Sequence, residues 1–84
     1  MTTPPLPSMN FYGPARYVIL VQGRIDPIWA DRLEGMAINR VEQAGESPLT
    51  ALEGQLSDQA ALAGVLNTLY ELHLPVLSVQ CLTT

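Results

Sequence analysis

The sequence predicts an α+β domain of the ferredoxin-like class, with two helices on one face of a four-stranded antiparallel sheet. Along the 84 residues, the predicted order is strand, helix, strand, strand, helix, strand, which is the split βαβ pattern. Right-handed crossovers between parallel strands place both helices on the same face of the sheet. We expect the first and third strands at the centre and the last strand at an edge beside the first, because the first strand is almost continuously apolar.

The first strand is predicted at residues 17–25, YVILVQGRI, because β-branched and aromatic residues dominate there and a glycine stands near its end.

Asp26 and Pro27 follow the first strand. Asp favours the N-cap of a helix and Pro favours its first position, so a short helix is expected over residues 27–35. Residues 36–42 are then read as the second strand.

One side of this short helix is expected to face the core, because three large apolar residues recur at i, i+4 and i+7: Trp29, Leu33 and Met36. Trp29 is interpreted as a core anchor. After a turn punctuated by glycine and proline, residues 49–56 are predicted as the third strand.

The main helix is predicted over residues 57–74, with Ser57 or Asp58 as its cap and Pro75 directly after its end. Its apolar stripe consists of Leu62, Val65, Leu66, Leu69 and Leu72. Residues 76–82, VLSVQCL, form the last predicted strand.

The chain divides into a proline-rich N-terminal arm, residues 1–15, and a single ferredoxin-like domain, residues 16–84. Four of the seven prolines lie in the arm, where they favour an extended conformation. Phe11 and Tyr12 are the arm residues that we expect to pack against a neighbouring molecule.

Composition excludes several classes of function. The formal net charge is −4 and the chain has no lysine, which argues against binding to nucleic acid and to anionic membranes. No apolar run reaches the roughly 20 residues of a membrane span, and a lone cysteine permits no internal disulfide. The cytoplasm is the expected location.

The residues that could take part in catalysis or bind a metal have structural explanations. Asp31 and Glu34 lie on a short polar helix face with nothing apolar around them, so they are not expected to act as an acid–base pair. His73 suits the end of the second helix, and Cys81 is interpreted as a small apolar residue of the last strand. No metal-ligand spacing or phosphate loop is present, so no cofactor is expected.

Two surfaces carry fewer charges than a solvated surface normally does. On the free face of the sheet we place Val18, Leu20, Gln22, Val76 and Ser78. On the outer side of the main helix, Ala60 and Gly64 form a small-xxx-small step that lets another backbone approach. A continuous apolar face of this kind is typical of a contact surface.

Between YVILVQGRIDPIWADRLEGM and DQAALAGVLNTLYELHLPVLSV the chain resembles a widespread group of small, uncharacterised bacterial proteins. They share the tryptophan of the first helix, the DQAAL helix start and the LPVLSV-like ending, over residues 17–82. Relatives tend to carry charged residues where Val18 and Leu20 stand, and often a histidine at Ala63 and a glycine at His73. The resemblance implies no particular activity.

The preferred hypothesis is a non-enzymatic module that binds a second copy of itself or another protein. A second hypothesis is a small-ligand regulatory domain similar to ACT domains, which bind metabolites at subunit interfaces, with a site lined by residues 23–26 and the start of the second helix. A third is a small enzyme built like the dimeric α+β barrels, with a pocket around Trp29, Tyr70 and His73.

Overall fold

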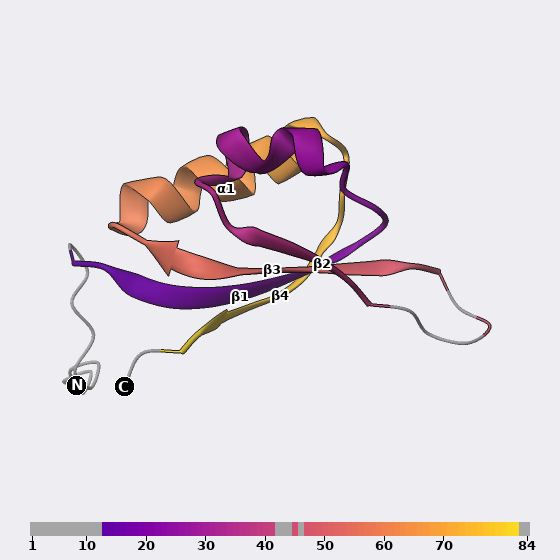
Figure 1. The fold of residues 1–84 in the computed structure, drawn as a ribbon, viewed down its shortest axis with the longest axis horizontal. Helices are drawn as coiled ribbons and strands as arrows, with labels where there is room; N and C mark the ends of the chain where they lie inside the picture. The colour runs from indigo at the N-terminus through magenta and orange to yellow at the C-terminus, as the bar shows by residue number, and fades with distance from the viewer. Residues whose placement is uncertain (1–12, 42–44, 46, 83–84) are drawn as a thin grey trace, which may run out of the picture.

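The computed structural model describes residues 13–41, 45 and 47–82, and it confirms the α+β class (Figure 1). The strands are β1 (Ala15–Gln22), β2 (Ala37–Val41), β3 (Leu49–Leu56) and β4 (Val76–Cys81). The helical segments are η1 (Pro27–Leu33) and α1 (Gln59–Glu71).

The four strands form one antiparallel sheet in the order β2-β3-β1-β4. The strands β1 and β3 are therefore central, and β4 lies at an edge beside β1, as the sequence predicted. Figure 1 shows η1 and α1 together on one face of the sheet, which we call the helix side. The opposite face is called the outer face.

The first strand lies two to three residues earlier than predicted. It begins at Ala15, inside the range assigned to the arm, and ends at Gln22. The reason is Gly23, which has a φ of 112° and turns the chain. Its N–H donates to the carbonyl of Pro48 at 2.8 Å, and an added Cβ would lie 2.9 Å from a methyl group of Leu74.

The short helix is a 3₁₀ helix, and its predicted N-cap is confirmed. Asp26 accepts a hydrogen bond from the Ile28 N–H at 3.0 Å, and the Trp29 N–H donates to the Asp26 carbonyl at 3.0 Å, the i→i+3 spacing of a 3₁₀ turn. Glu34 and Gly35 both adopt positive φ and end the helix.

Both ends of α1 are capped. The Asp58 side chain accepts from the Ala61 N–H at 2.8 Å. At the other end, His73 takes the left-handed conformation with a φ of 59°, and the Leu74 N–H donates to the Leu69 carbonyl at 3.1 Å. This is a Schellman-type ending in which histidine occupies the position that glycine usually takes.

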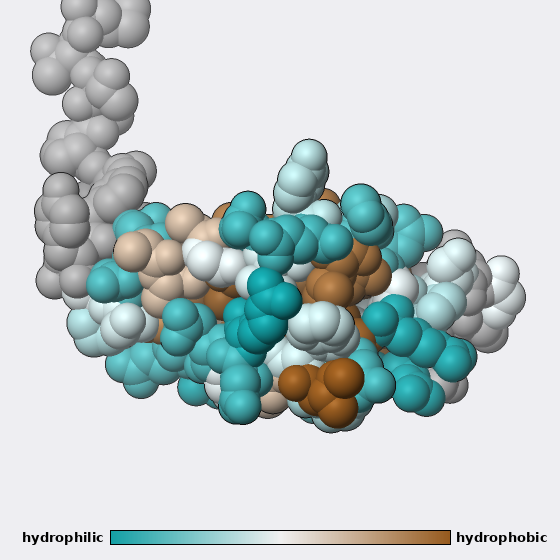
Figure 2. All heavy atoms as spheres, turned by 90° about the horizontal axis from the view of Figure 1, so that it is seen from above, coloured by the Kyte–Doolittle hydropathy of each residue, from teal (hydrophilic) through white to brown (hydrophobic). Residues whose placement is uncertain are grey.

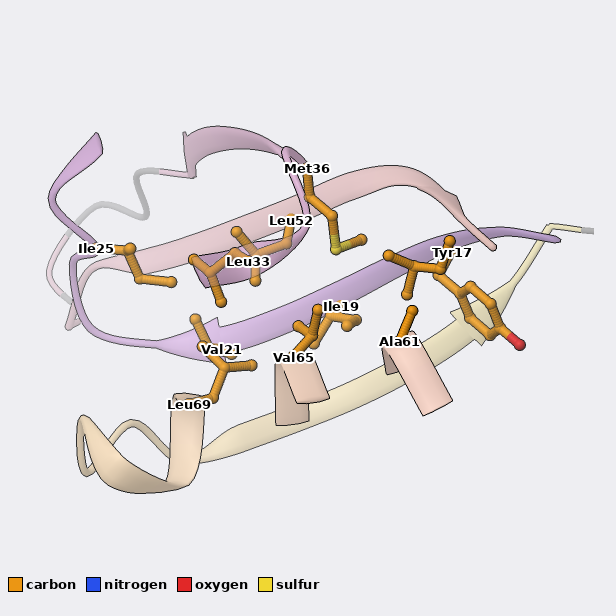
Figure 3. Packing of buried hydrophobic residues seen from close by; sticks show 11 residues of the cluster. Tyr17, Ile19, Val21, Ile25, Leu33, Met36, Leu52, Ala61, Val65 and Leu69 are labelled. Atoms are coloured by element: carbon orange, nitrogen blue, oxygen red, sulfur yellow. The ribbon is translucent and has the colours of Figure 1, made fainter. Parts of the chain in front are cut away.

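The core lies between the sheet and the two helical segments (Figure 3). The side chains of Ile19, Leu33, Leu52, Val65 and Leu69 are completely buried there. A core of this kind supplies the main driving force for folding, because it removes apolar surface from water.

The predicted apolar stripe of α1 is rotated slightly from the true inward face. Leu62 and Leu66 are only partly buried, although they pack against the core. Thr68 is buried instead, and its hydroxyl lies 3.0 Å from the carbonyl oxygen of Gly64 and 3.3 Å from that of Arg32, so that the two acceptors share its one proton. This hydrogen bonding allows a polar side chain to be buried outside the predicted stripe.

Candidate functional site

Among the described residues, the edge strand β4 and the residue after it carry four of the six large apolar side chains that remain exposed. Val76 is 40% exposed, Leu77 50%, Val79 42%, and Leu82, which follows the strand, 41%. No Asp, Glu, Lys or Arg follows Glu71 in the sequence. This edge therefore has no acidic or basic side chain, and its apolar side chains are exposed beside the polar Ser78 and Gln80.

The register with β1 shows which way each β4 side chain points. Val79 lies opposite Ile19 and Cys81 opposite Tyr17, and both partners belong to the buried core. Val79 and Cys81 therefore point to the helix side. Directly opposed residues share a face, so the intervening residues of β4 point to the outer face.

A β-bulge in β4 changes the orientation of Val76. The register shifts between Leu20 and Val21, so that Leu20 lies opposite Ser78 but Val21 lies opposite Val76. Val21 is buried in the core. The prediction that Val76 shares the outer face with Ser78 is therefore wrong, because Leu77 is the extra residue of the bulge and moves Val76 to the helix side.

The helix side of β4 is exposed although α1 lies on that side of the sheet. The buried residues of α1, among them Ala61, Val65 and Leu69, point toward the core beside β1 (Figure 3). They leave Val79 of β4 42% exposed.

The backbone of β4 also presents a free edge. In the described part of the chain, β4 pairs with β1 alone. The Leu82 N–H donates to the Arg16 carbonyl at 2.7 Å, and in an antiparallel ladder alternate residues direct their N–H and C=O groups to opposite sides. The backbone groups of Val79 therefore point away from β1, to the open edge.

The other sheet edge differs in its chemistry. The strand β2 is five residues long and includes Asn39 and Arg40, both exposed. Short length and charge are the usual features that prevent an edge strand from pairing with another chain. The strand β4 has no charged residue.

The outer face of the sheet is less exposed than the sequence suggested. Val18 and Leu20 are on this face and half-buried, Gln22 and Ser78 are exposed, and an ion pair between Arg16 and Glu53, 2.9 Å apart, crosses one end of it. These residues do form a common surface around β1. It is not, however, where the most exposed apolar side chains gather.

Ala60 and Gly64 are exposed on the outer side of α1, as predicted. Figure 2 looks onto the helical layer and shows hydrophilic side chains over much of this face, with hydrophobic groups in separate patches. Phe11 and Tyr12 lie outside the described residues. The expectation that they pack against a neighbouring molecule therefore stays a prediction.

The stretch around Trp29 has a structural explanation. Trp29 is partly buried at the margin of the core, and the Arg32 guanidinium lies 5.4 Å from the centre of its ring. Arg32 also pairs with Glu71 of α1 at 2.8 Å. These contacts join η1 to α1 at the surface, where exposed ion pairs contribute less than about 1 kcal/mol.

The residues of the small-ligand hypothesis lie at opposite ends of the sheet. Gly23 lies beside Pro48 and Leu74, whereas Gln59, at the start of α1, donates a hydrogen bond to the Tyr17 hydroxyl at 2.8 Å. Within a single chain the two segments are therefore separated, because α1 runs the length of β1 and only its C-terminal end approaches Gly23. A site of the ACT type lies at a subunit interface, so the small-ligand hypothesis stays a prediction.

A hollow of about 100 Å³ does lie next to residues 23–26, lined by Arg24, Ile25, Pro27, Ile38, Arg40 and Thr50. Pockets for metabolites usually measure roughly 300–1,000 Å³. The hollow holds the volume of only about three water molecules.

Two of the three residues expected around an enzyme pocket lie on one hollow. Tyr70 and His73 line a shallow hollow of about 310 Å³ with Leu74 and Pro75, and Tyr70 is 79% exposed. Trp29 is not among the lining residues. Among the described residues, no group of three His, Cys, Asp or Glu side chains is placed to hold a metal ion.

The fold and this surface together define an α+β domain with one uncharged, apolar sheet edge. Neither helical segment in the described part of the chain has the length and hydrophobicity needed to cross a bilayer.

Residues 16–80 match the model of a protein family described as a domain of unknown function, DUF8691, and the chain belongs to that family. No curated protein and no solved structure matches the chain.

Proposed function

We propose that this protein is a non-enzymatic interaction module that binds a second copy of itself through the edge strand β4. One observation carries the proposal. Of the six large apolar side chains most exposed in the described part of the chain, three lie on β4 and a fourth directly follows it. Contiguous exposed apolar surface of this kind marks interaction sites in soluble proteins.

The backbone supports the same conclusion. An edge strand presents unpaired N–H and C=O groups that another strand can bind, and natural proteins normally protect such edges with charge, proline or a covering element. The strand β2 has that protection in Arg40. The strand β4 has none within its residues, so pairing with another strand satisfies its backbone and covers its valine and leucine side chains.

The proposal includes a fold assignment and a location. The strand order β2-β3-β1-β4, with η1 and α1 on one face, supports the ferredoxin-like class. The single cysteine of the chain supports a reducing compartment such as the cytoplasm, because no internal disulfide is possible.

Sedimentation of the full-length protein tests the proposal. We expect the wild-type chain of 9.1 kDa to sediment as a dimer at high concentration. Val79→Lys should sediment as a monomer with an unchanged circular dichroism spectrum, because the edge then carries a charge at its centre. Ala60→Lys is the matched control on the exposed side of α1, and it should still dimerise.

Leu20→Glu separates the two candidate surfaces. If the outer face of the sheet were the contact, Leu20→Glu would dissociate the protein and Val79→Lys would not. That result, or a wild-type monomer from micromolar to millimolar concentration, contradicts association through β4.

A further inference from the structure

The sequence of β4 has a symmetry that bears on how two copies meet. Residues 77–81 read Leu, Ser, Val, Gln, Cys, which is apolar, polar, apolar, polar, apolar in both directions. Two such strands running antiparallel about Val79 oppose apolar residues with apolar residues and polar residues with polar ones. A contact between two identical chains can use this symmetry, because a two-fold interface brings the same surface patch of each copy together.

Resting on the proposed function, we infer that β4 pairs with β4 of a second copy in one register, in which Val79 lies opposite Val79. Leu77 then lies opposite Cys81. Ser78 lies opposite Gln80 on the outer face. No charged residue lies on β4, so no like charges oppose one another across the two-fold axis.

The backbone groups of Val79 have the direction that this register requires. Since the Leu82 N–H is directed at β1, alternation directs the N–H and C=O of Val79 to the open edge. Val79 of each copy can therefore exchange two hydrogen bonds with its counterpart. A hydrogen-bonded pair then lies on the symmetry axis.

Neighbouring registers are less complementary. An axis at Ser78 would oppose Val76 with Gln80, and an axis at Gln80 would oppose Ser78 with Leu82. Each of these pairs an apolar side chain with a polar one. The bulge at Leu77 limits regular pairing in that direction, so residues 77–81 form the complete paired segment.

The resulting assembly is one continuous sheet made of two four-stranded sheets. The two-fold axis is perpendicular to the sheet, because opposed residues must point to the same face. Both helical layers therefore lie on the same side of the joined sheet. Val79 of each copy is covered from the side by Val79 of the other, and Leu77 is covered by Cys81 of the other copy.

Cysteine cross-linking tests the register. In the Cys81→Ser background, the single variants Ser78→Cys and Gln80→Cys are prepared separately. Alone, neither should form a disulfide dimer under mild oxidation, because identical positions are offset by two residues and their Cα atoms lie about 8 Å apart. Mixed, they should form a dimer that contains one chain of each, since opposed Cα atoms lie about 4.5–5.5 Å apart.

Val79→Cys in the same background is the second measurement. Position 79 faces itself across the axis, so this variant should form a disulfide dimer alone, more slowly than the mixed pair because hydrogen-bonded pairs hold their side chains further apart. The wild-type protein is the control. Its Cys81 residues are separated by about 13 Å along the strands and should not link.

The results separate the register from the proposed function. A disulfide dimer of Ser78→Cys alone, or of wild-type Cys81, overturns the register. So does the absence of the mixed dimer while sedimentation still finds a dimer. If sedimentation finds a monomer throughout, the proposed function fails and the register fails with it.

Discussion

At the scale of single residues, Gly54 and Gly64 have opposite surroundings. A Cβ on Gly54 would lie 3.2 Å from the Met36 Cα, whereas a Cβ on Gly64 would have no neighbour within 4 Å. Gly54 lies in β3 opposite Tyr17, under the loop that brings Met36 into the core. Packing against Met36 therefore requires glycine at position 54. No such contact requires glycine at position 64.

We therefore expect Gly54→Ala to lower the free energy of unfolding by about 1–3 kcal/mol, the usual cost of overpacking against a fixed backbone. Gly64→Ala should raise it by about 0.5–1 kcal/mol, because alanine is the better helix residue at an exposed position. Urea denaturation at one fixed protein concentration measures both. Equal effects of the two substitutions would show that the contact with Met36 relaxes freely.

At the scale of the elements, the α1 cap is a single hydrogen-bonded side chain. Asp58→Ala removes the acceptor of the Ala61 N–H and should lower the free energy of unfolding by about 1 kcal/mol. Asp58→Ser keeps an acceptor and should restore most of this loss. If alanine and serine behave alike in urea denaturation, the cap contributes nothing to stability.

The elements themselves were largely predictable, because each has a local cause in the sequence. Asp26 and Asp58 cap the two helical segments as predicted, and residues 49–56 form β3 with the predicted bounds. What sequence reasoning missed is non-local. The bulge at Leu77 depends on how β4 aligns with β1, and no residue of β4 predicts it from the sequence.

The surface was harder to predict than the core for the same reason. The pattern identified β1 as apolar on both faces, and its inward residues are buried. The exposure of Val79, however, depends on how α1 and the sheet pack together in three dimensions, and the alternation of residues along β4 does not predict it. The charge pattern was the sequence signal that could have predicted an interacting edge at β4, since no acidic or basic residue follows Glu71.

At the scale of the whole molecule, association should be linked to stability. A chain of 84 residues has little core from which to gain stability, and binding of a second copy stabilises the folded state by mass action. We expect the Tm of the wild-type protein to rise with protein concentration in calorimetry. The Tm of Val79→Lys should be independent of concentration, and a concentration-independent wild-type Tm would contradict the linkage.

The unlike chemistry of the two sheet edges would also limit the size of the proposed assembly. Joining two copies at β4 would occupy the uncharged edge of both and leave β2, with Arg40, at either end of the joined sheet. A head-to-tail contact between β4 and β2 would instead leave one edge of each kind open to a further copy, and such contacts form filaments unless they close into a ring. The proposed assembly would therefore stop at a closed pair, and a substitution that removed the arginine would give the chain a route to open-ended polymerisation.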